Sequence, residues 1–190
     1  MIKAKDRADL LLFGQKTERL SFRKLDSEDF DTWLRFCEDP DSLRYFAFSE
    51  TDPADVKCRQ WFEKIAWRYE NSMGGMNVLI DKGSGEFVGQ CGLLVQNVDE
   101  QEELEVGYSL MPEFRGLGYA LEAAQKCRDF AFQNQLADSL ISIIHPDNIA
   151  SQNVALKNGM KLSKQTIYSG MSVKVYRIMK AEWKTNLKQK

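Results

Sequence analysis

Histidine is nearly absent from this 190-residue chain, and cysteine is sparse. His145 is the single histidine, and the four cysteines (Cys37, Cys58, Cys91 and Cys127) show no C-x-x-C spacing. Metal centres are usually built from close clusters of these residue types, so no metal is expected here. Cysteines spaced this widely are typical of reduced thiols, which predicts a cytoplasmic location.

The sequence also lacks a long apolar run, an excess of one charge and an internal repeat. Its longest early apolar stretch covers residues 10–13 and follows Asp6 and Asp9, so neither a signal peptide nor a transmembrane helix is expected. A net charge of −2 gives no electrostatic reason to expect nucleic acid or an anionic membrane as a partner. A length of 190 residues predicts one domain, with or without extensions, and an apolar content of 43% is enough for its core.

Residues 104–132 have the pattern of a strand, a glycine turn and a helix in direct succession. Apolar residues alternate with others over residues 104–110, Gly116 and Gly118 mark the turn, and apolar side chains recur on one helical face over residues 120–131. The first amides of a helix lack partners within it and carry partial positive charge. Because glycine leaves the backbone open, these amides can approach a phosphate closely.

Two common phosphate motifs do not match this turn. A dinucleotide fingerprint needs a third glycine where Leu121 stands, and no Gly-Lys-Ser/Thr follows for a Walker loop. The residues 115–120 (RGLGYA) instead match R-x-x-G-x-A, which resembles the acetyl-CoA pyrophosphate loop of GNAT-family N-acetyltransferases. Residues 107–110 (GYSL), 119–123 (YALEA) and 17–23 (TERLSFR) look similar to the ribosomal-protein-alanine (RimJ/RimL-type) branch of that family.

The remaining patterns predict the element order β α α β β β α β α β β over residues 17–180. This order matches the α/β (α+β) GNAT fold, which implies a central mixed, twisted sheet of about seven strands flanked by about four helices. Strands 104–110 and 139–145 are expected to pair in parallel, and Gly89 and Gly92 predict a bulge or a close backbone approach. Residues 97–103 are predicted to form an acidic turn. Residues 1–16 are an N-terminal extension without an assigned role, and residues 181–190 a charged, frayed C-terminal tail.

A second motif starts the predicted helix after residue 147. Asn148, Ser151, Val154 and Gly159 follow the family pattern N-x-x-S/A-x-x-V-x-x-x-x-G. The resemblance implies that Asn148 contacts the pantetheine arm of the coenzyme and that Ser151 protonates the departing thiolate. Position alone also allows Asn148 to be a helix N-cap and Ser151 an ordinary first-turn serine.

The chain departs from the family at two places. Ala155 stands where many members carry a tyrosine acid, and residues 167–171 contain no acid where some ribosomal-protein acetylating members place a glutamate. The first departure leaves Ser151 or water as the acid. The second argues against a strictly ribosomal-protein substrate.

The resemblance implies direct transfer to an amine that has first lost its proton. An alkyl amine has a pKa near about 10, so a base is required. Glu105 is the first candidate base, with a purely structural carboxylate as the alternative. His145 is a distant second candidate, and the favoured interpretation is that it only ends its strand. A backbone amide near Tyr108–Leu110 would hold the oxyanion, and amides of the turn the pyrophosphate. The predicted coenzyme contacts are Tyr108, Ser109, Leu110, Arg115, Gly116, Leu117, Gly118, Tyr119, Ala120, Asn148 and Ser151.

The acceptor is expected to enter between residues 43–49 and the hairpin 168–171. Arg44, Tyr45 and Phe46 are the candidate substrate contacts, whereas Trp33 is assigned to the core. Carboxylates are scarce in these segments, which favours a peptide or protein N-terminus over a polycation, unless folding brings the acids of residues 100–103 to the rim.

The leading hypothesis is therefore an acetyl-CoA-dependent N-acetyltransferase, monomeric or homodimeric, acting on a protein or peptide N-terminus. One alternative is an acetyltransferase for a small amine such as an amino acid, polyamine or aminoglycoside. Another is a non-catalytic acyl-CoA-binding sensor. A third, a nucleotide-binding oxidoreductase, is disfavoured by Leu121.

Overall fold

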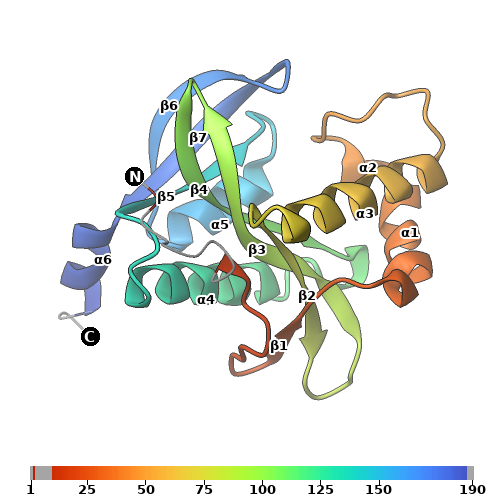
Figure 1. The fold of residues 1–190 in the computed structure, drawn as a ribbon, viewed down its shortest axis with the longest axis horizontal. Coiled ribbons are helices and arrows are strands. Elements are labelled where there is room, and N and C mark those ends of the chain that lie inside the picture. Colours follow the sequence, from red (N-terminus) through yellow and green to blue (C-terminus); the bar gives the residue numbers. More distant parts are fainter. Residues whose placement is uncertain (1, 3–9, 188–190) are drawn as a thin grey trace.

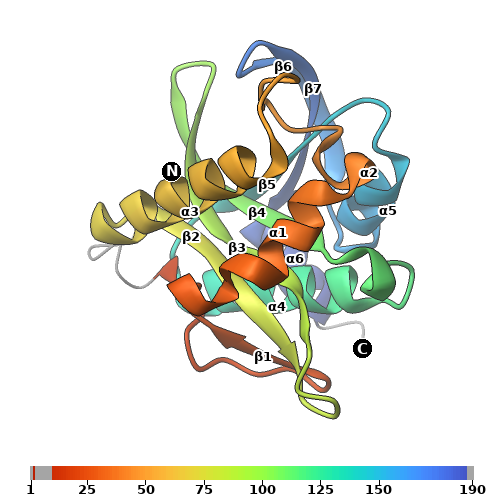
Figure 2. The ribbon, with the colours of Figure 1, turned by 90° about the vertical axis from the view of Figure 1, so that its right-hand side faces the viewer.

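A computed structural model describes residue 2 and residues 10–187 of the chain, and shows one twisted sheet with helices on both faces (Figures 1 and 2). Seven strands form the sheet in the order β1-β2-β3-β4-β5-β7-β6. They are β1 (Leu20–Arg23), β2 (Gly74–Asp81), β3 (Phe87–Val98), β4 (Gln101–Leu110), β5 (Ser139–Ile144), β6 (Lys161–Tyr168) and β7 (Met171–Met179).

The helices confirm the predicted order, with two additions. They are α1 (Phe30–Glu38), α2 (Pro40–Leu43), α3 (Ala54–Glu70), α4 (Tyr119–Gln133), α5 (Ile149–Lys157) and α6 (Lys180–Leu187), with short 3-10 turns η2 (Ser27–Asp29) and η3 (Pro112–Phe114). The short α2 and the C-terminal α6 are not predicted from the sequence. Helices α1 and α3 cover one face of the sheet, and α4 packs on the other (Figure 2).

The sheet is antiparallel except between β4 and β5, where the expected parallel pairing is confirmed but brief. Only Glu105 and Ile141 pair across these strands. Beyond that pair, side chains replace the backbone ladder: the Ser142 hydroxyl donates to the Val106 carbonyl at 2.8 Å, and the Ile143 N–H donates to Glu105 Oε1 at 3.3 Å. We call the region where these two strand ends part the split.

Close backbone approach explains the two glycines of β3, as predicted. A Cβ on Gly92 would lie 2.0 Å from the Gly75 carbonyl oxygen, and one on Gly89 would lie 2.3 Å from the Ser109 carbonyl oxygen. The β2–β3 register also shifts opposite Gly89, between Leu79 and Ile80. Both predicted features, a bulge and a close approach, are therefore present.

The acidic turn predicted over residues 97–103 is wrong in its extent. Strand β3 continues to Val98 and β4 begins at Gln101, so that only Asp99 and Glu100 form the turn, both with positive φ. Contacts to β6 hold the turn: Thr166 donates to Asp99 at 2.7 Å, and Lys164 pairs with the same carboxylate. The long-range support outweighs the low strand propensity of the acidic residues.

Both ends of the described chain pack on the domain. The predicted frayed tail is wrong for residues 181–187, which belong to α6. This helix buries Trp183 against Phe132, and the Trp183 indole N–H donates to Asp129 at 2.8 Å. At the other end, Leu10 and Leu12 are fully buried in the main core. Residues 1 and 3–9 of the predicted extension, and 188–190 of the tail, lie outside the described residues.

Candidate active site

The predicted anion site is present as an open turn before α4. Gly116 and Gly118 take φ values of 77° and 85°, which L residues rarely adopt, and Gly118 caps α4 without a side-chain bond. The first backbone bond of the helix runs from the Glu122 N–H to the Gly118 carbonyl, at 3.1 Å. Among the described residues, no acceptor pairs with the N–H groups of residues 116–121. These amides are therefore free to bind an anion.

A charged network fixes this end of α4. The Arg19 guanidinium bonds to Glu122 at 2.6 Å and to the Leu117 carbonyl at 3.0 Å, and lies 4.2 Å from the centre of the Tyr119 ring. Burial pushes the pKa of Glu122 up, but hydrogen bonds from Thr17 and Arg19 outweigh it and lower the pKa overall. Neither Arg19 nor Glu122 is among the predicted site residues, although both lie in segments that carry the family resemblance.

Arg115 turns its side chain toward the protein rather than toward the open turn. Its Nε donates to the Leu110 carbonyl at 3.2 Å, one terminal nitrogen donates to Asp39 at 3.1 Å, and the other contacts the Ser42 hydroxyl. Arg115 thus braces the turn against the α1–α2 segment. Its predicted role in coenzyme binding stays a prediction that rests on its place in the loop.

Strand geometry determines which β4 amides face the split. In an antiparallel ladder the N–H and C=O of one residue point to the same neighbour. The Met111 N–H bonds to β3, whereas the carbonyls of Val106 and Leu110 accept bonds on the opposite side. By alternation, the N–H groups of Tyr108 and Leu110 face the split, while the backbone of Ser109 faces β3. Tyr108 and Leu110 therefore have the orientation that an oxyanion site requires.

A cavity of about 420 Å³ lies at the split, which we call the split cavity. Its walls come from the linker before α3, from α3 itself, from the start of α5 and from the β6–β7 hairpin. Glu105 is the one carboxylate in its described lining. The lining includes Tyr45, Phe46, Phe48, Trp61, Lys64, Ile65, Arg68, Gln96, Glu105, Tyr108, Ser109, Ser142, His145, Asn148, Ser151, Tyr168 and Met171.

Glu105 is held in this cavity by two hydrogen bonds. Gln96 donates its side-chain amide to Oε2 at 2.6 Å, and the Ile143 N–H donates to Oε1. Burial raises the pKa of Glu105 above its ordinary value, whereas these hydrogen bonds and the cations of Arg68 and Lys64 lower it, without overcoming the effect of burial. A carboxylate with a raised pKa is a better proton acceptor than an exposed one.

Arg68 and Gln96 are functional candidates that the sequence analysis missed. Buried Arg68 donates to the carbonyls of Met73 and Val95 at 3.0 and 3.1 Å, and to Gln96 Oε1 at 2.8 Å. Arg68 could have been found, because it interrupts the apolar stripe of α3 seven residues after Trp61. Gln96 carries no such signal, since it follows an apolar strand and precedes a turn.

Asn148 and Ser151 lie where the second motif places them, at the start of α5. Asn148 Oδ1 caps the helix by accepting from the Ser151 N–H at 3.0 Å, so the N-cap interpretation is confirmed. The Tyr108 hydroxyl donates to the Ser151 carbonyl at 2.8 Å and ties α5 to β4. Both side chains line the split cavity, and Ala155 is buried. Their roles toward the coenzyme stay predictions.

Of the three predicted acceptor contacts, two line the split cavity and one does not. Tyr45 lines the cavity, stacks on His145 with ring centres 5.0 Å apart and donates to the Asp147 carbonyl at 3.2 Å. Phe46 lines it too and packs edge-on against Trp61. Arg44 is exposed and does not belong to the described lining. Trp33 is fully buried, which confirms its assignment to the core.

The acids of residues 100–103 do not reach the rim of this cavity. None belongs to its described lining, and Glu103 pairs instead with Arg177 on β7, at 2.5 Å. The scarcity of carboxylates expected from the sequence therefore holds in the folded protein.

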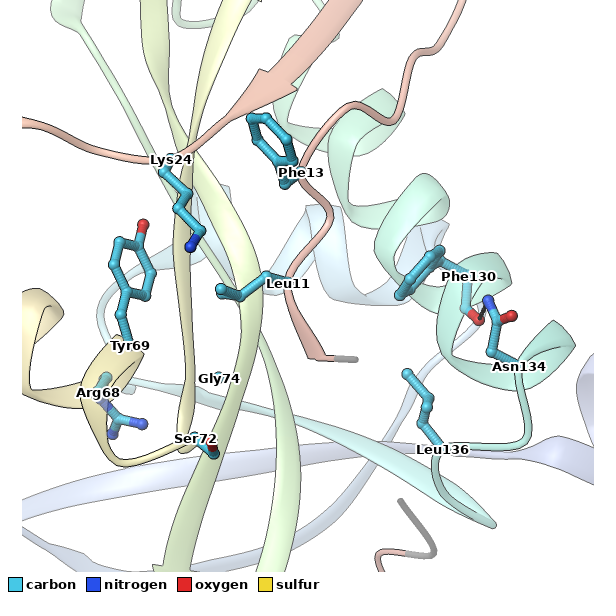
Figure 3. A pocket seen from close by; sticks show the side chains of 10 residues that line it. All are labelled: Leu11, Phe13, Lys24, Arg68, Tyr69, Ser72, Gly74, Phe130, Asn134 and Leu136. Atoms are coloured by element: carbon cyan, nitrogen blue, oxygen red, sulfur yellow. Dashed lines mark hydrogen bonds between the residues drawn. The ribbon is translucent and has the colours of Figure 1, made fainter. Parts of the chain in front are cut away.

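A second cavity, of about 570 Å³, lies between the N-terminal segment and the C-terminal ends of α3 and α4. Figure 3 shows Leu11 and Phe13 between Tyr69 on one side and Phe130 on the other. Arg68 is the one residue that lines both cavities. None of the predicted site residues lines this second cavity, so the chemistry is assigned to the split cavity.

Comparison with known proteins agrees with this geometry. The family model described as "Acetyltransferase (GNAT) domain" matches residues 19–161. YkkB of Bacillus subtilis (strain 168) is 35% identical over 152 residues, which cover 78% of this chain and 85% of that protein. An uncharacterized N-acetyltransferase, p20 of Bacillus licheniformis, is 30% identical over 152 residues, which cover 78% of this chain and 82% of that protein.

Solved structures share the fold. An acetyltransferase from Agrobacterium tumefaciens str. C58 superposes with a TM-score of 0.72 at 27% identity, covering 86% of this chain and 92% of that one. A RimL ribosomal-protein α-N-acetyltransferase solved with coenzyme A (TM-score 0.71, 15% identity, coverage 87% and 97%) shows likeness of fold alone. A Vibrio cholerae spermidine N-acetyltransferase solved with CoA and spermine also shares the fold alone. Its TM-score is 0.68 at 14% identity, and the match covers 88% of this chain and 99% of that one.

Across the described ranges, no helix combines the length and the apolar character needed to cross a bilayer. The family model covers the glycine turn, the split and the start of α5, which are the parts that build the site described above. The chain therefore belongs to the GNAT acetyltransferase family and is an N-acetyltransferase.

Proposed function

We propose that the protein transfers an acetyl group from acetyl-CoA to the N-terminal amine of a peptide or protein, in a ternary complex of both substrates. The observation that carries the proposal is the position of Glu105, a carboxylate held in the split cavity next to Tyr108, whose N–H faces the same split. A base and an oxyanion donor beside one cavity are what attack of an amine on a thioester requires.

Acetyl-CoA would lie along the split with its pyrophosphate on the glycine turn. The unpaired amides of residues 116–121 support that assignment, because they combine N–H donors with the positive end of the α4 dipole. Asn148 uses Oδ1 as the helix cap, so its Nδ2 remains as the donor toward the pantetheine arm. The proposed resemblance to the RimJ/RimL-type branch rests on sequence motifs alone.

Proton transfer would need one base and one acid. Glu105 would take a proton from the acceptor ammonium, directly or through water, so that the neutral amine attacks the thioester carbonyl. The N–H groups of Tyr108 and Leu110 would stabilise the oxyanion that forms. When the carbon–sulfur bond breaks, the Ser151 hydroxyl would protonate the leaving thiolate. Such acid–base steps each contribute about 10²- to 10⁴-fold in rate. A protein that only senses acyl-CoA would not need a carboxylate held in the split cavity at Glu105.

The lining of the cavity supports an N-terminus over a polycation. Clustered acids attract polyamines and aminoglycosides, whereas the described part of this lining has aromatic residues and a single carboxylate. The alternative is a small amine, and one observation favours it: a cavity of about 420 Å³ falls within the range of small-molecule sites.

All four cysteines are free and buried, which is compatible with the proposed cytoplasmic location.

A thiol-release assay with a matched acceptor panel tests the proposal. The panel contains a short peptide with a free N-terminal alanine, the same peptide with a blocked N-terminus, an amino acid, spermidine and an aminoglycoside. Turnover on the free peptide alone, lost in Glu105→Gln, is the expected result. Turnover on spermidine with none on any peptide would refute the peptide assignment, and no turnover on any amine would favour the sensor.

A further inference from the structure

Helix α3 presents one face to the split cavity, whose lining also includes the segments between which the acceptor is expected to enter. Trp61, Lys64, Ile65 and Arg68 follow the i, i+3, i+4, i+7 spacing of a single helical face, and all four line the cavity. Two of them are cations. The described lining contains only one carboxylate, Glu105, so the fixed charges of the cavity sum to a positive balance.

The two cations on this face differ in how they are used. Arg68 is buried, and its guanidinium donates hydrogen bonds to the carbonyls of Met73 and Val95 and to Gln96. Lys64 keeps an exposed side chain, and its ammonium has neither a hydrogen bond nor an ion pair among the residues that the structure describes. A charged donor beside a substrate cavity without an internal partner is available to a ligand.

The surroundings of Lys64 favour an anion as that ligand. Partial desolvation in the cavity wall and repulsion from Arg68 lower the pKa of Lys64, whereas Glu105 raises it. A bound carboxylate would act on Lys64 as Glu105 does, because it stabilises the ammonium form. Carboxylate–ammonium pairs are also stronger than neutral hydrogen bonds when water is partly excluded.

We propose that Lys64 forms a carboxylate subsite for the acceptor, so that the preferred substrate is an amine with an acidic group a few bonds away. For a peptide, this is an N-terminus with an aspartate or glutamate among its first three residues. The inference rests on the proposed acetyl transfer and narrows its substrate class.

Peptides that differ only in charge test the subsite. The set is Ala-Asp, Ala-Asn and Ala-Lys, each followed by the same neutral tail, with a second set that carries the variable residue at position three. Asn has nearly the shape of Asp, so the reacting amine is closely matched. We expect kcat/KM to be about fivefold or more higher for Asp than for Asn, and lower again for Lys, from the strength of partly exposed ion pairs.

Variants of α3 assign the preference to one residue. Lys64→Met should bring the Asp-to-Asn ratio to about one, and Lys64→Glu should favour the Lys peptide. Lys57→Met removes the same charge from α3 outside the cavity lining and should leave the ratio unchanged. A wild-type ratio of one or less in both sets, or a ratio that survives Lys64→Met, would overturn the subsite.

A binding measurement separates this inference from the proposed function. If no peptide is acetylated, the proposed function fails, and calorimetry with the N-acetylated Asp and Asn peptides and CoA still probes Lys64. Tighter binding of the Asp peptide that disappears in Lys64→Met supports the subsite. Equal binding, or no binding of either peptide, rejects it.

Discussion

Gln96 and Glu105 are diagonal neighbours on β3 and β4, joined by a 2.6 Å hydrogen bond from the Gln96 amide to the carboxylate. Arg68 determines the direction of that bond. Its guanidinium donates to Gln96 Oε1, as does the Tyr168 hydroxyl, so the Gln96 amide nitrogen must face Glu105. Glu105, the candidate base, is therefore held by Gln96, whose side-chain amide satisfies its hydrogen bonds in one orientation.

Loss of the Gln96 donor should shift the pH profile of the reaction. The hydrogen bond favours the charged carboxylate and lowers its pKa, against the larger effect of burial. Gln96→Leu should therefore raise the pKa of Glu105 further and move the acidic limb of kcat/KM to higher pH. Tyr168→Phe removes a hydroxyl that bonds to Gln96 rather than to Glu105, and should shift the limb less. Profiles that coincide with wild type would show that Gln96 does not tune the base.

Removal of the candidate base should separate turnover from binding. Glu105→Gln keeps the shape of the side chain but cannot accept the proton, so kcat should fall by about 10²- to 10⁴-fold. Acetyl-CoA affinity, measured by calorimetry, should change little, because the glycine turn lies on another part of the fold. If Glu105→Gln retains most of its turnover, the general base is His145 or solvent instead of Glu105.

The free amides of the glycine turn should make acetyl-CoA a stabilising ligand. At about 100 times its dissociation constant it should add about 2.7 kcal/mol to the free energy of unfolding, measured by denaturant titration, and NAD should add nothing. Gly118→Glu places a side chain and a negative charge at the anion site and should abolish the gain. Gly85→Glu is the control, because Gly85 has a similar φ in the β2–β3 hairpin, with open space around it. Stabilisation by NAD alone would contradict the assignment.

Local motifs explain which parts of this site could be predicted from the sequence. The glycine turn and the Asn148 cap each depend on residues within a few positions of one another, so their patterns predict them directly. Glu105 is predicted as the candidate base from its place on the central strand. Its partners Gln96 and Arg68 could not be predicted, because they meet only when the β3–β4 register and the packing of α3 are known.

The same reasoning accounts for the errors. Trp183 lies in a charged segment, and contacts with Phe132 and Asp129 stabilise a helix there. Arg44 follows the short helix α2, which the sequence did not predict, and it lies outside the described cavity lining, so its contact with the acceptor stays a prediction. At Trp183, tertiary contacts rather than local propensity decide the outcome.

Ser151 should affect the chemical step rather than coenzyme binding. Ser151→Ala should lower kcat by about 10- to 1000-fold, within or just below the range of acid–base groups, with little change in the acetyl-CoA dissociation constant. Tyr108→Phe is the structural control, since it breaks only the hydroxyl bond to the Ser151 carbonyl that ties α5 to β4. Equal losses in affinity and turnover in Ser151→Ala would identify the serine as a binding residue.

The Arg19–Glu122 pair should make the stability of the α4 start depend on pH. The pKa of Glu122 is lowered in the folded protein, so the carboxylate stabilises the fold above its ordinary pKa of 4.5, and that contribution is lost as pH falls below it. Because Arg19 is partly exposed, Glu122→Gln should cost only about 1 kcal/mol at neutral pH, and the difference from wild type should shrink through the acidic range. Urea titrations of both proteins from pH 7 to 3 measure this, with Glu113→Gln, from the exposed Arg35 pair, as the control. A difference that stays constant over that range would mean that the Glu122 contacts stabilise α4 through shape and hydrogen bonding, independently of its charge.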